Sequence, residues 1–193
     1  MFLSLLALLV SGFSLYESTL RSPQIAVYVP PQLTYTDPDR PETPFEVFVL
    51  PVTIANSGAQ SGTVLAVNLE VVNPRTKQSK LFYAARLGTW GDKPERAFAP
   101  VALAGKTSYS ESIQFFPRVG EKVARILDFE GGDYRFKLML DTAGAGRTVW
   151  LLSQPAAVLE FERRIGKLDY RNFQGTGTME MWAADYRSSS SQP

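Results

Sequence analysis

One stretch, residues 45–74, constrains the fold of this chain more than any other. Apolar residues recur at every second position in both of its halves, which is the period of an extended strand with one buried face. Between the halves, Asn56-Ser57-Gly58 and Ser61-Gly62 supply residues that tolerate a change of chain direction. This turn either pairs the two strands or carries the chain from one sheet to another. The residues predicted to face the core are Phe48, Leu50, Val52 and Ile54 in the first strand and Thr63, Leu65, Val67, Leu69 and Val71 in the second.

Further strands are predicted on both sides of this stretch. The first strand of the stretch is apolar on both faces, since Val47 and Val49 lie opposite its core residues, so we expect it to be central in its sheet. Residues 118–130 fit either a short helix or a packed loop. The segment 176–186 is either a final strand or an arm along the surface. The other predicted strands are 24–29, 80–86 with Leu81, Tyr83 and Ala85 on one face, 98–103, 108–116, 134–140, 148–152 in a hairpin with 134–140, and 158–165.

Many short strands with turn residues between them indicate an antiparallel sandwich or barrel. The turn at Asn56-Ser57-Gly58 and the run from Gly132 to Leu138 resemble bacterial immunoglobulin-like domains over roughly residues 45–152. The resemblance implies an all-β, immunoglobulin-like antiparallel β-sandwich in which Tyr134 closes a corner. We therefore expect a membrane anchor or signal segment at 1–21, a sandwich at 24–170, a strand or arm at 171–187 and a disordered tail at 188–193.

Cysteine and histidine are both absent from the 193 residues, which excludes several classes of function. The chain cannot form disulfides, thiolate or imidazole zinc sites, or a catalytic centre with a Cys nucleophile or a His base. An enzyme would have to use carboxylates, Lys or Tyr. Basic and acidic residues nearly balance at a net charge of +1 and form no long runs, so the sequence indicates no binding to nucleic acid.

The first sixteen residues carry no charged side chain, and the first one is Glu17. The apolar run is longer than a typical signal-peptide core and shorter than a full membrane span, which needs about 20 residues. Three interpretations remain open: an uncleaved transmembrane anchor, which we favour, a signal peptide cleaved near Ser11-Gly12 or Ser14, and a buried helix. The first two interpretations place the rest of the chain outside the cytoplasm, in the periplasm or at the cell surface. If the segment is cleaved, the chain is secreted.

Four groups of residues are candidates for a binding or chemical role. Trp90 lies between glycines in a polar loop, and aromatic side chains in such loops serve sugar and protein recognition, so the predicted ligand-binding residues are Trp90, Asp92 and Arg96. An acidic loop could offer oxygens to calcium, although its prolines favour a rigid loop without metal. Two methionines could bind copper but fit core packing better, and one carboxylate lies on an apolar strand face, where an Arg partner is the commoner outcome. The acidic loop contains Asp37, Asp39 and Glu42, the two methionines are Met179 and Met181, and the carboxylate is that of Glu111.

The sequence thus predicts a non-catalytic, membrane-tethered domain that acts by protein–protein contact, for example as an accessory subunit of an envelope complex. The alternative is a module that binds carbohydrate or a small ligand with the Trp90 loop. We expect no cofactor, no metal and no nucleic-acid partner.

Overall fold

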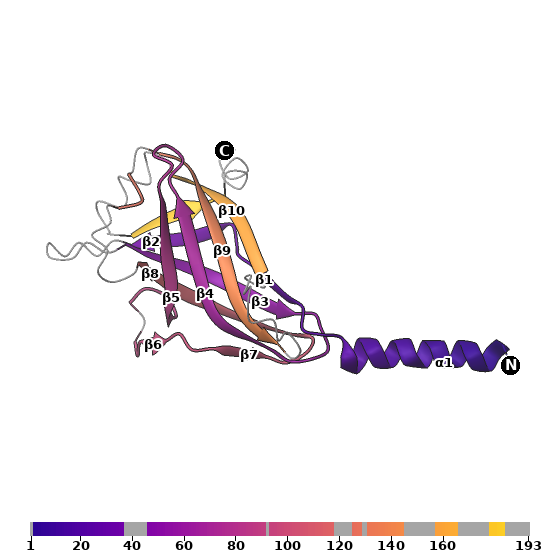
Figure 1. Ribbon diagram of the computed structural model, residues 1–193. Helices are drawn as coiled ribbons and strands as arrows, with labels where there is room; N and C mark the ends of the chain where they lie inside the picture. The colour runs from indigo at the N-terminus through magenta and orange to yellow at the C-terminus, as the bar shows by residue number, and fades with distance from the viewer. Residues whose placement is uncertain are drawn as a thin grey trace, which may run out of the picture.

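The computed structural model describes residues 2–36, 46–91, 93–117, 125–128, 131–144, 157–165 and 178–183. The chain begins with helix α1 (Phe2–Leu15), which continues into one turn of π-helix, η1 (Tyr16–Leu20). Figure 1 shows this helix projecting from one end of a β-structure, without packing against it. The window Leu3–Leu20 is 0% buried and is apolar enough to cross a membrane or to act as a signal sequence. The third interpretation, a buried helix, is therefore wrong, and the predicted apolar N-terminal segment is confirmed.

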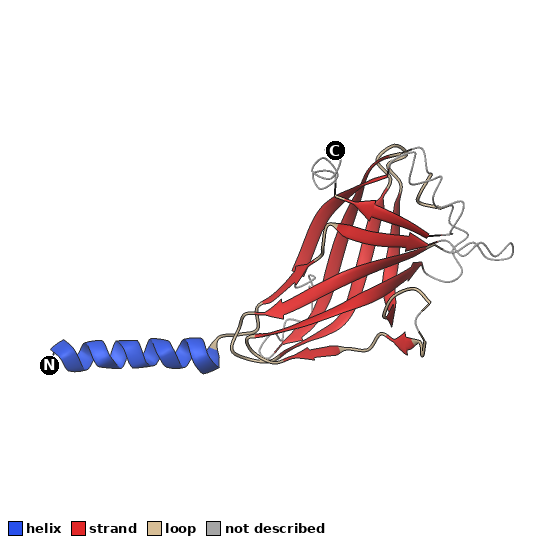
Figure 2. Cartoon of the chain, turned by 180° about the vertical axis from the view of Figure 1, so that it is seen from behind, coloured by secondary structure: helices blue, strands red, loops and turns tan. Residues whose placement is uncertain are grey.

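In the part of the chain that the structure describes, eleven strands follow the helix, and Figures 1 and 2 show their arrangement. Their bounds are β1 (Ile25–Tyr28), β2 (Gln32–Thr36), β3 (Val47–Asn56), β4 (Gly62–Val72), β5 (Ser79–Leu87), β6 (Arg96–Ala97), β7 (Val101–Leu103), β8 (Thr107–Pro117), β9 (Gly132–Gly144), β10 (Ala157–Ile165) and β11 (Thr178–Trp182).

Eight of these strands close into an antiparallel barrel, and the other three lie outside the ring. The order around the barrel is β5-β8-β3-β2-β11-β10-β9-β4, and pairing of β4 with β5 closes it. The predicted immunoglobulin-like sandwich is therefore wrong. A sandwich consists of two separate sheets with free edges, whereas here the hydrogen-bonded ladder runs continuously around one core. The three strands outside the ring are β1, β6 and β7.

The predicted strands of residues 45–74 are present as β3 and β4, which are separated in the barrel by β8 and β5. The turn between them thus carries the chain across the barrel instead of forming a hairpin. The four predicted core residues of β3 are buried, but in β4 Leu65 is 48% exposed and Val64 is buried instead. The register of β4 against β9 shifts between Val64 and Ala66. This β-bulge adds one residue, so the side chains before it exchange faces relative to the strict alternation.

The predicted core face of β5 is also wrong. Lys80 and Phe82 are buried, whereas Leu81, predicted to face the core, is 44% exposed. Both faces of β5 carry apolar side chains, and a lysine on the inner face made that face look like the solvent side. The lysine is accommodated by an ion pair inside the barrel, described below.

Other predicted elements have mixed outcomes. Strands β1, β8, β10 and β11 confirm the predictions at 24–29, 108–116, 158–165 and 176–186, whereas β7 covers only residues 101–103 of the strand predicted at 98–103. Strand β2 was missed, because only Leu33 and Tyr35 alternate after the Pro30-Pro31 pair. The predicted strand 148–152 lies outside the described residues, and β9 pairs with β10 along nine residues. Of the segment 118–130, residues 125–128 are described and form no helix.

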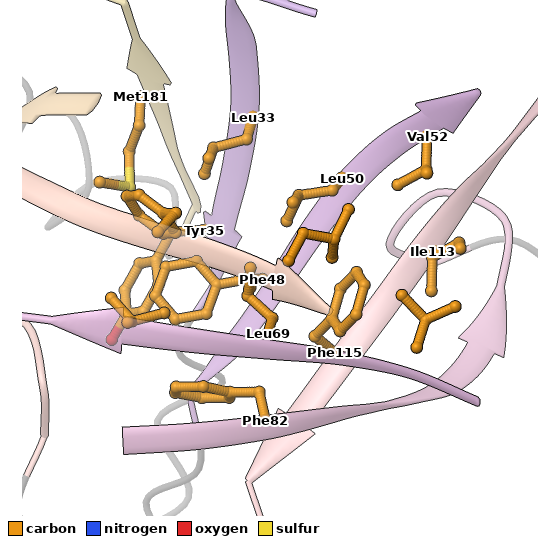
Figure 3. Packing of buried hydrophobic residues seen from close by; sticks show 14 of the residues in the cluster. Leu33, Tyr35, Phe48, Leu50, Val52, Leu69, Phe82, Ile113, Phe115 and Met181 are labelled. Carbon is orange, nitrogen blue, oxygen red and sulfur yellow. The ribbon is translucent and has the colours of Figure 1, made fainter. Parts of the chain in front are cut away.

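The core lies inside the barrel and is rich in aromatic rings (Figure 3). Phe48 on β3 is 0% exposed. Its ring packs against Tyr35, Phe82 and Phe136 at centroid distances of 5.1, 4.9 and 5.6 Å. The edge-on geometry of the last two pairs is the arrangement that aromatic quadrupoles favour. Met179 and Met181, weighed above as thioether ligands, are 3% and 0% exposed and belong to this core.

Candidate functional site

The predicted binding loop, residues 87–97, starts at the end of β5 and includes β6. The backbone of its first residues is held against β8, because the Gln114 amide donates hydrogen bonds to the carbonyl oxygens of Gly88 (3.2 Å) and Thr89 (2.9 Å). The other end is held by the pairing of β6 with β5, beside which Arg86 and Glu95 form an exposed ion pair of 2.7 Å. Trp90 lies between these fixed ends and is 37% exposed.

The three predicted ligand-binding residues have different placements. Arg96 lies on β6 and forms an ion pair of 2.8 Å with Glu111 on β8, with side chains 54% and 24% exposed. Asp92 lies outside the described residues. Glu111 therefore has the Arg partner that the sequence favoured for it. Because the Arg96 side chain is more than half exposed, its guanidinium group remains accessible to a polar ligand.

A split in the barrel wall explains why Arg96 meets Glu111. Strand β4 pairs with β5 only as far as Asn68 and Tyr83. Beyond that point β6 pairs with β5 and β7 pairs with β4, so residues 96–103 fill the space between the two strands. Close to the split, burial raises the pKa of Tyr109, and the neighbouring Glu111 carboxylate raises it further while Arg96 opposes it. Tyr109 thus remains protonated at neutral pH and can donate a hydrogen bond.

A second polar group, which the sequence analysis missed, lies inside the opposite end of the barrel. Glu46 is 1% exposed and accepts a charge-assisted hydrogen bond from Lys80, itself 8% exposed, at 2.6 Å. Its other oxygen accepts hydrogen bonds from the Tyr35 hydroxyl (3.2 Å) and from the backbone N–H groups of Ile126 (2.8 Å) and Leu127 (3.2 Å). The carboxylate therefore has donors for both oxygens, which is the condition for burying a charge.

The segment 125–128 is fixed by further hydrogen bonds to the same end. The Tyr134 hydroxyl donates to Asp128 at 2.9 Å and accepts from the Asp128 backbone N–H at 3.2 Å. Asn73 donates to the Ile126 carbonyl at 3.0 Å, and Arg75 forms an ion pair of 2.7 Å with Asp128. Burial is the main cause that raises the pKa of Tyr134. Tyr134, which was expected to close a corner of a sandwich, instead joins residues 125–128 to the start of β9.

Glu46 lies two residues before Phe48, so strict alternation places both side chains on the buried face. This was the signal that could have revealed the cluster. The partner of Glu46, Lys80, was hidden by the wrong choice of core face on β5. Because every oxygen of Glu46 is engaged and the cluster is enclosed, its role is to hold residues 125–128 across the barrel end. Among the residues that the structure describes, no group of three or more acidic side chains comes together to hold a metal ion. The acidic loop with Asp37, Asp39 and Glu42 lies outside them.

The outer wall formed by β4, β9 and β10 carries a ladder of charges in register. Lys137 lies between Glu70 and Glu160, and Arg135 lies beside Glu162. Ion pairs join Arg135 to Glu162 at 3.1 Å and Lys137 to Glu160 at 3.5 Å. These side chains line a shallow hollow of about 370 Å³. Nearby, a hydrogen bond from Arg164 lowers the pKa of Asp133.

Comparisons with known proteins add no assignment. No family model matches the sequence, and no curated protein matches it. Among solved structures, the chain is similar to a crystal structure of a candidate ApaA protein from Bordetella pertussis, with 13% identity, a TM-score of 0.39 and coverage of 85% of this chain and 97% of that one. It is also similar to the X-ray structure of a structural-genomics target, with 12% identity, a TM-score of 0.39 and coverage of 83% and 88%. Likenesses at these scores support no conclusion about function.

Proposed function

We propose that this chain is a non-catalytic barrel domain tethered to a membrane by α1 and η1, located outside the cytoplasm and acting through protein–protein contact. The observation that carries the proposal is the helix itself. Its large apolar side chains, from Leu3 to Leu20, are about half or more exposed, which is unfavourable in water unless a membrane covers them.

An anchor is favoured over a cleaved signal by the continuity of the helix. The candidate cleavage points at Ser11-Gly12 and Ser14 lie within α1, which runs on to Leu20 through η1. Residue 21 is already hydrogen-bonded to the barrel through its carbonyl oxygen. Residues 21–24, which follow the helix, are hydrogen-bonded to the barrel and are not a free linker that a peptidase could easily bind.

The charge ladder on β4, β9 and β10 is the face that we assign to a protein partner. It presents fixed charges of both signs around a hollow, and such patterns select a complementary surface more than they add stability. Substitutions of exposed ladder residues are also expected to change the free energy of unfolding little, since surface ion pairs contribute about 0–1 kcal/mol.

Co-purification tests this proposal. The full chain, solubilised from membranes in mild detergent, is expected to retain a stoichiometric protein partner, and the double variant Arg135→Glu, Lys137→Glu is expected to lose it. Lys77→Glu is the control. It also replaces a positive charge by a negative one, but it lies in the turn between β4 and β5, and it is expected to retain the partner. A chain that is monomeric and without a partner in every preparation contradicts the proposal.

A second candidate function is binding of a carbohydrate or small ligand at the Trp90 loop. It is favoured by Trp90 remaining 37% exposed although both ends of its loop are fixed. A pre-positioned ring loses little freedom on binding. On a glycan array, Trp90→Ala is expected to weaken binding by at least about tenfold, roughly 1.4 kcal/mol. Tyr28→Ala, which removes an aromatic ring 60% exposed on β1, is the control. Binding that Trp90→Ala leaves unchanged removes this candidate.

A further inference from the structure

The connection between helix and barrel is hydrogen-bonded to one loop at the barrel end, and this loop is hydrogen-bonded to a second. We call this the anchor junction: residues 21–24 with the loops 56–61 and 103–107. The carbonyl oxygen of Arg21 accepts hydrogen bonds from the backbone N–H groups of Ala59 (2.9 Å) and Gln60 (3.0 Å). Ser57 donates its backbone N–H to the Gln24 carbonyl at 3.0 Å. The chain therefore passes from the helix into the barrel without a flexible linker.

Asn56 at the end of β3 joins all three segments of the anchor junction. It is 1% exposed. Its Oδ1 accepts from the backbone N–H groups of Gln24 (3.1 Å) and Gly58 (3.0 Å). Its Nδ2 donates to the carbonyl oxygens of Gln60 (2.9 Å) and Ala104 (3.1 Å). A short amide with both of its ends engaged fixes the relative positions of these backbones.

Backbone segments in the anchor junction are also in direct contact. A Cβ on Gly58 would collide with the carbonyl oxygen of Ser22, and one on Gly105 would collide with the carbonyl oxygen of Ala59. Glycine is required at both positions because backbone approaches backbone there. The junction thus has no room to adjust by small side-chain movements.

The length of the helix adds a second constraint. Its apolar window of 18 residues spans about 27 Å, close to or slightly below the roughly 30 Å of a bilayer core. A span of this length does not need to tilt to remain buried. Glu17, which lies in the last turn of this window, and Arg21, paired with it at 2.9 Å, are then near the membrane interface. An upright helix on a fixed junction determines how the barrel stands on the membrane.

We infer that the barrel end formed by the anchor junction is a membrane-contacting surface that rests against lipid headgroups. This inference rests on the proposed anchor. The loops at residues 57–61 and 104–107 contain Lys106 and no acidic residue, which suits an anionic lipid surface. The Glu46 end of the barrel points away from the membrane. Strand β4, with 11 residues, rises about 28 Å along the barrel axis at a tilt of about 40°.

Fluorescence quenching in vesicles tests this arrangement. Because the chain contains no cysteine, Ser61→Cys and Gln78→Cys each provide one labelling site, near and far from the membrane respectively. The full chain is reconstituted into vesicles of neutral and anionic lipid that carry spin-labelled headgroups. The label at position 61 is expected to be quenched several-fold more than the label at position 78. A variant with ten Gly/Ser residues inserted after Leu20 keeps the barrel contacts and is expected to lose the difference.

The possible outcomes distinguish a failure of the membrane-contacting surface from a failure of the proposed anchor. Equal quenching at positions 61 and 78 in the chain without the insertion, while it floats with the vesicles, overturns the membrane-contacting surface and leaves the anchor standing. A difference that survives the insertion supports the membrane-contacting surface, because this barrel end would then contact the headgroups even without the fixed junction to place it there. A chain that fails to float with vesicles overturns the anchor itself.

Discussion

Replacing Glu46 by Ala is expected to lower the free energy of unfolding by about 3–5 kcal/mol, the largest single-residue effect on stability that we expect. The substitution removes the partner of Lys80, which is 8% exposed and cannot recover its hydration without opening the barrel. It also removes the acceptor for the N–H groups of Ile126 and Leu127, so two buried donors lose their hydrogen bonds. Urea unfolding of the full chain in detergent, followed by tryptophan fluorescence, measures the change.

Three further variants show whether the effect comes from the buried charge. Lys80→Met, which leaves the carboxylate buried with fewer donors, is expected to be comparably destabilising. The double variant Glu46→Leu, Lys80→Met is expected to cost clearly less than the two single changes added together. Glu162→Ala removes an exposed pair with Arg135, 57% and 76% exposed, and is expected to cost at most about 1 kcal/mol. If Glu46→Ala costs no more than Glu162→Ala, the enclosed ion pair does not hold the barrel end.

Strict alternation made much of this fold predictable. In β3 and β9 every second residue is apolar, and the structure buries Phe48 and Leu50 on one strand and Phe136 and Leu138 on the other. The all-β class follows from such strands separated by turns. The closure of the barrel does not, because it depends on the pairing of β4 with β5, and a sandwich has the same pattern of buried and exposed faces.

The errors on individual strands have local physical causes. Leu65 was predicted to be buried because a one-residue bulge at this position in β4 cannot be seen in the alternation. Leu81 was predicted to be buried because Lys80, on the true core face, is a charge that sequence patterns place in solvent. Only the structure shows that Glu46 neutralises it.

The candidate site was predictable only in part. An exposed Trp90 in a polar loop follows from the glycines around it, and the partner expected for Glu111 is present as Arg96. The split between β4 and β5 that brings Arg96 and Glu111 together depends on pairing between distant strands. The anchor junction was missed as well, since Asn56 is read from the sequence as an ordinary turn residue.

The second large effect that we expect concerns the helix. Deleting residues 2–20 is expected to move the chain almost completely from the membrane fraction to the aqueous fraction, because the deletion removes the proposed anchor, whose apolar side chains the bilayer would cover. The unfolding temperature of the barrel is expected to change little, since Leu3–Leu20 are 0% buried and pack against no strand. Carbonate extraction of membranes, followed by thermal unfolding of both forms, measures the two quantities. A deleted chain that stays with the membranes would show that another surface holds it there.

The N-terminal residue of the mature protein tests the membrane-tethered barrel most directly. Membranes from expressing cells are separated from the soluble fraction, and the chain in each is identified by intact mass and by its N-terminal peptides. We expect the membrane fraction to contain a chain that retains residues 2–20 together with the barrel. A mature chain that begins at or after Gly12 and is found in the soluble fraction would contradict the anchor, and with it the proposed attachment of this barrel to a membrane.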